Sequence, residues 1–139
     1  MRMSLRAALL LLLLPFAAGA MAGDAVQDPA EAAARVWLEA ADRGDGSETW
    51  KLAAPLFQDS IPAAQWQQKL TAARSPLGPL KARKLSSTTR TSRLPGAPDG
   101  AYVVLRFDSQ FEHKAGAVET VTAMQQPDGS WRVAGYYIH

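Results

Sequence analysis

Apolar residues recur with the period of a helix in the first part of the chain and with the period of a strand in the second part. The earliest helix signal is Asp28-Pro29-Ala30-Glu31, in which Asp28 is a capping residue, Pro29 suits the first helical position and Glu31 completes a capping box. The apolar residues that follow lie on one helical face: Ala33, Ala34, Trp37, Leu38 and Ala41. We therefore predict a first helix that stops at Gly44 and Gly46.

Two further helices are predicted before the chain reaches Gly78. One begins near Ser47, and Pro55 breaks or kinks it because proline lacks an N–H group and clashes with the preceding turn. The other begins after Pro62 and ends at Ser75-Pro76, with its apolar residues at helical spacing: Ala63, Trp66, Leu70 and Ala73. The pattern thus predicts three helices in the N-terminal part of the domain.

From Leu80 onward the period changes to that of β-strands. Tyr102–Phe111 alternates, which places Phe107 on the apolar face and Asp108 on the polar face. Leu80–Leu94 has few apolar residues and is predicted to be an edge strand whose lysines and arginines discourage aggregation. The remaining strands are predicted at residues 118–125 and 131–138, and the turns at residues 95–100, 114–116 and 127–129. This order predicts an α+β domain, with three N-terminal helices packed on one face of a curved four-stranded antiparallel sheet.

A secretory signal is predicted at the N-terminus. Arg2 and Arg6 precede an apolar run at residues 7–18, which is shorter than the about 20 residues of a transmembrane helix. Small residues then allow cleavage after Ala20 or after Ala22. We expect residues 1–22 to be a Sec-type signal peptide and residues 23–139 to form one domain. The protein is then periplasmic or secreted, without a membrane association after cleavage.

Loss of the signal peptide changes the charge balance. The full sequence has 15 lysines and arginines against 13 acidic residues, and 13 of each remain once Arg2 and Arg6 are removed. Nucleic-acid binding is not expected, because no aromatic residue for base stacking occurs between Trp66 and Tyr102 in the basic part of the chain. The basic residues of the edge strand are expected to be simply solvated, and the alternative is that they bind an anionic surface of the envelope. These residues are Lys81, Arg83, Lys84, Arg90 and Arg93.

No motif in the sequence names a reaction. There is no cysteine, and the two histidines, His113 and His139, have no partner at a metal-ligand spacing. The one acid–base arrangement that we can propose pairs a carboxylate base with a tyrosine, as Asp108 with Tyr102 or Tyr136. Asp108 is expected to face away from the core, so we predict no catalytic, cofactor-binding or metal-binding residue.

Aromatic residues are the candidates for lining a small apolar pocket between the helices and the sheet: Trp37, Trp66, Phe107, Trp131 and Tyr137. Alternation along the last strand places Trp131, Val133 and Tyr137 on one face and Tyr136 on the other, while Gly135 marks a bulge or a close backbone approach. The alternative role of these aromatic residues is core packing. In that role Trp131 presses against a helix near Trp37 or Trp66.

Several stretches resemble known families. The end of the chain, Asp128-Gly129-Ser130-Trp131-Arg132-Val133, resembles the last strand of the nuclear transport factor 2-like (cystatin-like) superfamily. Other stretches resemble an exported bacterial family, the domain of unknown function 4019: residues 53–57, 94–100, 102–105 and 118–122. The resemblance covers nearly all of the chain after residue 22. It implies a cone-shaped fold, with ligands between the helices and the sheet and with homodimers that form through the sheet.

Two functions are compatible with these observations. The first is a periplasmic binding or interaction module without catalytic activity, whose partner is a small apolar ligand or an envelope protein. The alternative is a small isomerase, dehydratase or hydrolase that uses a carboxylate in the cone pocket. A buried Asp or Glu that is paired with Tyr or His and has a raised pKa favours the enzyme, whereas a dry, filled cone favours the module.

Overall fold

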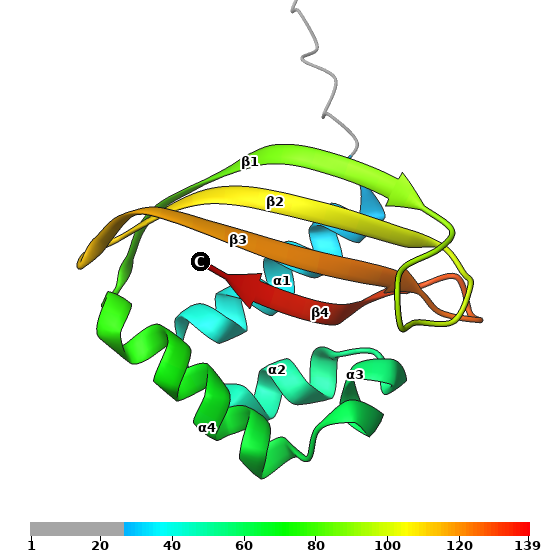
Figure 1. The fold of residues 1–139 in the computed structure, drawn as a ribbon, viewed down its shortest axis with the longest axis horizontal. Helices are drawn as coiled ribbons and strands as arrows, with labels where there is room; N and C mark the ends of the chain where they lie inside the picture. The colour runs from blue at the N-terminus through cyan, green and yellow to red at the C-terminus, as the bar shows by residue number, and fades with distance from the viewer. Residues whose placement is uncertain (1–26) are drawn as a thin grey trace, which may run out of the picture.

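The computed structural model describes residues 27–139. The predicted signal peptide, residues 1–22, and its two cleavage positions lie outside the described residues. The elements follow in the order α1 (Pro29–Asp42), α2 (Gly46–Leu52), α3 (Pro55–Ser60), α4 (Ala63–Arg74), the short 3₁₀-helix η1 (Ser75–Leu77), β1 (Leu80–Thr91), β2 (Tyr102–Phe111), β3 (Lys114–Gln125) and β4 (Trp131–Ile138). All helices precede all strands (Figure 1), so the predicted α+β class is confirmed. No helix within residues 27–139 is long and apolar enough to cross a membrane.

The start of α1 is the one that the capping signal predicts. Asp28 Oδ1 accepts hydrogen bonds from the N–H groups of Ala30 at 2.9 Å and Glu31 at 3.3 Å, and Pro29 lies in the first turn. The Glu31 carboxylate does not complete the predicted capping box. It pairs instead with Arg35 one turn later, at 2.8 Å, because residues four apart are neighbours on a helix surface.

The predicted count of three helices is wrong, because the second predicted helix is in fact two. The break at Pro55 occurs as expected, but Pro55 also takes the first position of α3, where its missing N–H group leaves no hydrogen bond unmade. Between α2 and α3, Ala53 and Ala54 are extended and lie beside β4. Ala53 forms a parallel bridge to Val133, and the Ala54 N–H donates to the Val133 carbonyl at 2.7 Å. The break thus joins the helices to one edge of the sheet.

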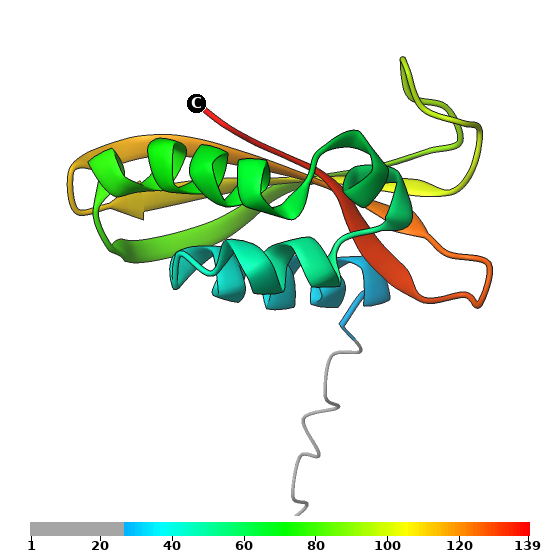
Figure 2. The ribbon, with the colours of Figure 1, turned by 90° about the horizontal axis from the view of Figure 1, so that it is seen from below.

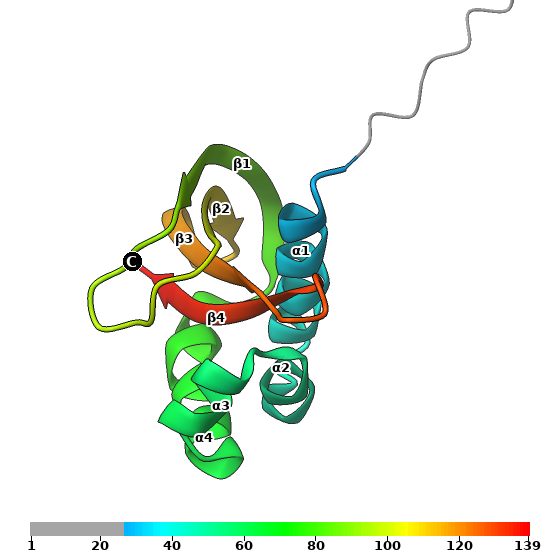
Figure 3. The same cartoon turned by 90° about the vertical axis from the view of Figure 1, so that its right-hand side faces the viewer.

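The four strands form one antiparallel sheet in the order β1-β2-β3-β4. Seen from below, the helices lie in front of the sheet, on the same side of it (Figure 2). An end-on view shows the sheet as a curved layer with α1 along one side and α2, α3 and α4 beneath β4 (Figure 3). This arrangement leaves the opposite face of β2 and β3 uncovered by helices.

One predicted turn is misplaced. The chain reverses at Glu112 and His113, and β3 already begins at Lys114, inside the turn predicted at residues 114–116. The N–H groups of Glu112 and His113 donate at 2.9 Å to the carbonyls of Pro79 and Leu77. These contacts with the segment before β1 fix the position of the turn. The alternation of residues along the chain carries no information about them, so the turn was predicted too late.

A bulge changes the faces of the last strand. Val133 pairs with Ala123 and Gly135 pairs with Thr122, so Ala134 is the extra residue and the predicted irregularity beside Gly135 is confirmed. The extra residue reverses the alternation after Val133. Tyr136 therefore faces the core, where its ring lies 4.9 Å from that of Trp37, and Tyr137 is 62% exposed. The predicted faces of Tyr136 and Tyr137 are wrong for this reason.

The core lies between α1 and the sheet and extends to α4. Its largest fully buried side chains include Trp37, Phe107 and Leu70. Trp37 and Trp66 pack with ring centroids 5.9 Å apart. The indole N–H of Trp37 donates to the Thr49 carbonyl at 2.9 Å, and that of Trp66 donates to the Thr49 hydroxyl at 2.8 Å. Buried polar groups on the aromatic residues are thus satisfied, as a stable core requires.

Candidate functional site

A fully buried carboxylate lies at the centre of the sheet's inner face. Glu119 on β3 is 0% exposed. Its Oε1 accepts hydrogen bonds from Ser109 Oγ on β2 at 2.6 Å and from Arg83 Nε on β1 at 2.8 Å. Its Oε2 accepts a hydrogen bond of 2.5 Å from the Tyr136 hydroxyl on β4. The other three strands therefore each contribute one side chain to the contacts around this carboxylate of β3.

A second carboxylate continues these contacts into the helices. Asp42, at the end of α1, receives a two-point pair from Arg83, with Nη1–Oδ2 and Nη2–Oδ1 both at 2.8 Å. Arg74, at the end of α4, donates to Asp42 Oδ1 at 2.6 Å and lies 3.8 Å from Glu119 Oε2. Its guanidinium also stacks on Phe111, 4.8 Å from the ring centroid. We call this group the ionic cluster; its members are Asp42, Arg74, Arg83, Ser109, Glu119 and Tyr136.

The charges of the ionic cluster balance, with two guanidinium groups against two carboxylates. Partial burial alone would raise the pKa of Asp42, but hydrogen bonds and positive charge from Arg83 and Arg74 outweigh it and hold the pKa below its ordinary value of 3.8. Burial raises the pKa of Tyr136, and the negative charge of Glu119 raises it further. Tyr136 is therefore the protonated donor to Glu119 across the physiological range.

Glu119 and Tyr136 form the buried carboxylate–tyrosine pair that the enzyme alternative expects, but the hydrogen bonds around Glu119 leave it little freedom to act as a base. A general base must lie within hydrogen-bond reach of a substrate proton. Both oxygens of Glu119 already accept strong hydrogen bonds. Arg83 contacts Oε1 through both Nε and Nη2, and the Arg83 side chain is only 9% exposed. The geometry suits a structural tie between α1, α4 and the sheet.

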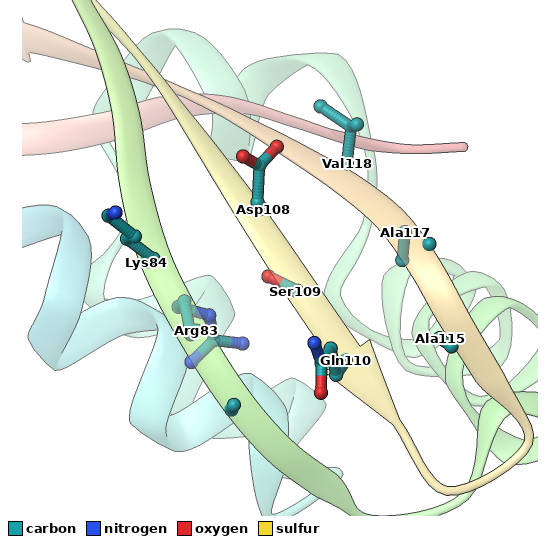
Figure 4. Close-up of a pocket in the computed structure, with 10 residues that line it drawn as sticks. Arg83, Lys84, Asp108, Ser109, Gln110, Ala115, Ala117 and Val118 are labelled. Atoms are coloured by element: carbon teal, nitrogen blue, oxygen red, sulfur yellow. The ribbon is translucent and has the colours of Figure 1, made fainter.

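The predicted pairing of Asp108 with a tyrosine is not formed. Asp108 is exposed on the outer face of the sheet, as alternation with Phe107 predicts. It lines an open pocket of about 310 Å³ together with Lys84 and Val118 (Figure 4). The Tyr102 hydroxyl donates to the Pro98 carbonyl at 2.5 Å, and Tyr136 belongs to the ionic cluster on the other face. Asp108 is thus a carboxylate without the donor that the enzyme mechanism would need.

Four of the five aromatic candidates for a pocket lining lie in or against the core, and Tyr137 alone faces outward. Trp37 and Phe107 are completely buried, and Trp66 is nearly so. Trp131 is half-buried and lines a groove of about 400 Å³ between α1 and the start of β4, so its helix neighbours are Ala32, Ala33 and Val36 of α1. Tyr137 faces outward, and Tyr136 takes the place against Trp37 that was expected for Trp131. A ligand site on these residues stays a prediction.

The basic edge strand is not uniformly solvated. Arg83 is largely withdrawn from solvent into the ionic cluster, because its position in β1 pairs with Ser109 and points to the inner face. Arg90 pairs with Asp28 at the start of α1, and Arg93 lies 3.5 Å from Asp99. The expectation of a plain solvated edge is therefore wrong for Arg83.

The sequence does carry a signal for the ionic cluster. Glu119 is in phase with Val121 and Ala123 along β3, so alternation places it on the apolar face. Arg83 is likewise in phase with Leu85 on β1. A charged residue at an inward position must find a partner, since an isolated buried charge is very costly. That reasoning would have found both residues, although not their partners on α1 and α4.

The fold and the cluster define an α+β arrangement in which α1 and α4 are tied to the sheet by largely buried ion pairs. Among residues 27–139 no three or more His, Cys, Asp or Glu residues come together as a metal site would require. A family model described as protein of unknown function (DUF4019) matches residues 33–136, from α1 to Tyr136 in β4. The chain belongs to this family, which confirms that part of the resemblance. No curated protein and no solved structure matches the chain.

Proposed function

We propose that the protein is an exported binding or interaction module of the bacterial envelope that performs no catalysis. The observation that carries this proposal is the ionic cluster, in which the buried carboxylate Glu119 has its hydrogen-bonding capacity taken up by Arg83, Ser109 and Tyr136. Trp37 packs against Tyr136, with ring centroids 4.9 Å apart, and belongs to a core of buried side chains between the helices and the sheet. A filled interior favours recognition at the surface over chemistry in a cavity.

Two further parts of the proposal rest on the sequence. Residues 1–22 have the charged, apolar and small-residue regions of a signal peptide, which supports export to the periplasm. The motif Asp128–Val133 and the order of helices before a curved sheet support a cone-shaped, nuclear transport factor 2-like architecture. Many members of such a fold class differ in function, so the fold alone does not select an activity.

Export is tested by expression of the full chain in a Gram-negative host, followed by fractionation and intact mass. We expect a periplasmic product that has lost about 20 to 22 residues. Recovery of the full-length chain in the membrane fraction would contradict the export part of the proposal.

The absence of catalysis is tested with the purified domain and a mixture of small esters, cyclic ketones and hydroxy acids, followed by proton NMR. We expect no turnover by the parent protein or by Glu119→Gln. Turnover by the parent that is lost in Glu119→Gln, at a temperature where circular dichroism shows that the variant is folded, would overturn the module and establish the carboxylate enzyme.

Surface recognition is tested by a photo-crosslinking amino acid placed in living cells at exposed positions on two sides of the molecule, Val36 and Tyr137. Adducts of discrete mass at either position support an interaction module. Their absence at both positions, in a protein that is exported and folded, counts against it.

A further inference from the structure

One half of β4 has an open strand edge. The sheet order places β4 at the edge of the sheet, and the extended residues Ala53 and Ala54 cover it only at Val133. No strand of residues 27–139 pairs with the outer side of residues 135–138. This second half of the edge therefore has no β-sheet partner within the described chain.

The hydrogen-bond pattern shows which backbone groups point outward. Val118 and His139 exchange both of their backbone hydrogen bonds, at 2.9 and 3.1 Å. Because exchanging pairs alternate along an antiparallel ladder, Tyr137 also faces β3, whereas Tyr136 and Ile138 direct their N–H and C=O groups away from it. These four groups are spaced as an added strand requires.

A groove runs along this edge. It has a volume of about 240 Å³ and lies between one face of α4 and the end of β4. Its lining includes three consecutive strand residues, Tyr136, Tyr137 and Ile138, which alternate between the two faces of the sheet. A pocket that touches all three must lie beside the strand, and the rest of its lining comes from α4.

The two edges of the sheet differ in their protection. The edge at β1 carries Lys81, Lys84 and Arg90, and charged side chains are a common means of preventing strand addition. Residues 134–138 of β4 carry no charge at all. On the groove wall opposite them Trp66 and Leu70 are buried, and the exposed residues are Ala73 and one charged residue, Lys69. Lys69 is exposed, and no ion pair joins it to another residue among 27–139.

From these observations we propose that the free half of β4 binds an extended peptide segment of a partner protein, which adds to the sheet as a fifth strand. Main-chain hydrogen bonds to Tyr136 and Ile138 give affinity, and alternate side chains enter the groove. The groove selects aliphatic side chains next to Ala73 and Ile138, and Lys69 selects an acidic residue beside them. This inference rests on the proposed function, since it names the partner class of an interaction module.

The test uses the domain of residues 23–139 and a defined probe, the fluorescently labelled hexapeptide Thr-Val-Thr-Val-Thr-Glu, measured by fluorescence anisotropy. We expect the peptide to bind saturably. Replacement of its glutamate by lysine should weaken binding about tenfold. Methylation of its two valine nitrogens should abolish binding, because methylation removes backbone hydrogen-bond donors. In NMR spectra the amide signals of Tyr136 and Ile138 should shift on titration. No saturable binding up to about 1 mM would overturn the proposal.

A matched pair of variants tests the edge itself. Ile138→Pro removes an outward N–H group and leaves the β3–β4 ladder intact, so the fold is retained, whereas Ile138→Val keeps the N–H group. We expect Ile138→Pro to weaken binding at least about tenfold and Ile138→Val to bind nearly as the parent does. Equal binding by Ile138→Pro would contradict strand addition. If that variant does not fold, Lys69→Glu serves instead, with a preference reversed toward the Lys-containing peptide.

Two controls separate this inference from its alternatives. Sedimentation velocity without peptide tests a second copy of the chain as occupant: a dimer that Ile138→Pro dissociates would overturn the peptide proposal. Crosslinks at Val36 but not at Tyr137, together with a failed titration, would reject the β4 site and retain the interaction module. Turnover that depends on Glu119 would reject the module itself.

Discussion

Removal of one charge from the ionic cluster should destabilise the protein far more than removal of a surface charge. In Glu119→Gln the shape of the side chain is kept, but Arg83 and Arg74 are left with one carboxylate, Asp42, for two guanidinium groups. Loss of one partner from a buried ion pair costs about 3–5 kcal/mol. That is a large share of the about 5–15 kcal/mol that stabilises a typical domain.

The matched control is Asp108→Asn, which removes the same charge from the neighbouring strand. Asp108 is exposed on the outer face and belongs to no ion pair within residues 27–139. Its substitution should change the free energy of unfolding by no more than about 0.5 kcal/mol. The two variants therefore separate the effect of burial from the effect of charge.

Urea unfolding at pH 7, followed by tryptophan fluorescence, measures both variants against the parent. At roughly 4 °C for each kcal/mol in a domain of this size, Glu119→Gln should also melt roughly 12–20 °C lower. A double variant, Arg83→Met with Glu119→Leu, should be less destabilised than the two single changes predict, because it removes both charges of a pair together. Equal stability of Glu119→Gln and Asp108→Asn would refute the assignment of the cluster as a structural tie.

Further predictions concern other groups of the core. The stability that Asp42 contributes should be present above its ordinary pKa of 3.8 and lost as pH falls through its lower folded pKa, so Asp42→Asn should show a smaller acid-induced fall in urea midpoint than the parent. Burial raises the pKa of Tyr136, so its hydroxyl should stay protonated in the native protein up to about pH 11. Absorbance titration should therefore count the same number of ionising tyrosines in native Tyr136→Phe and in the native parent, and one tyrosine fewer in unfolded Tyr136→Phe than in the unfolded parent. Trp37→Ala should cost about 3–5 kcal/mol in thermal melts. Half-buried Trp131→Ala should cost less, about 1–3 kcal/mol; equal losses would contradict the difference in burial.

Local interactions explain why many elements are predictable from the sequence. The cap at Asp28, the break at Pro55 and the alternation of Tyr102–Phe111 each depend on residues within one or two turns of the chain. The helix count was missed at Pro55 because the same ring that ends one helix also favours the start of the next. Faces along β4 were missed because one extra residue, Ala134, reverses the alternation beyond it.

The candidate site depends on contacts that local sequence does not specify. Alternation places Glu119 and Arg83 on the inner face of the sheet, and the cost of burying a charge requires that each has a partner. The identity of those partners follows from how α1 and α4 cross the sheet, which brings Asp42 and Arg74 to the same end of the core. The open edge of β4 has the same origin, since Ala53 and Ala54 cover the strand at Val133 and leave residues 135–138 uncovered. Local periodicity determines which face of an element is buried, whereas the packing of distant elements determines what each buried group meets.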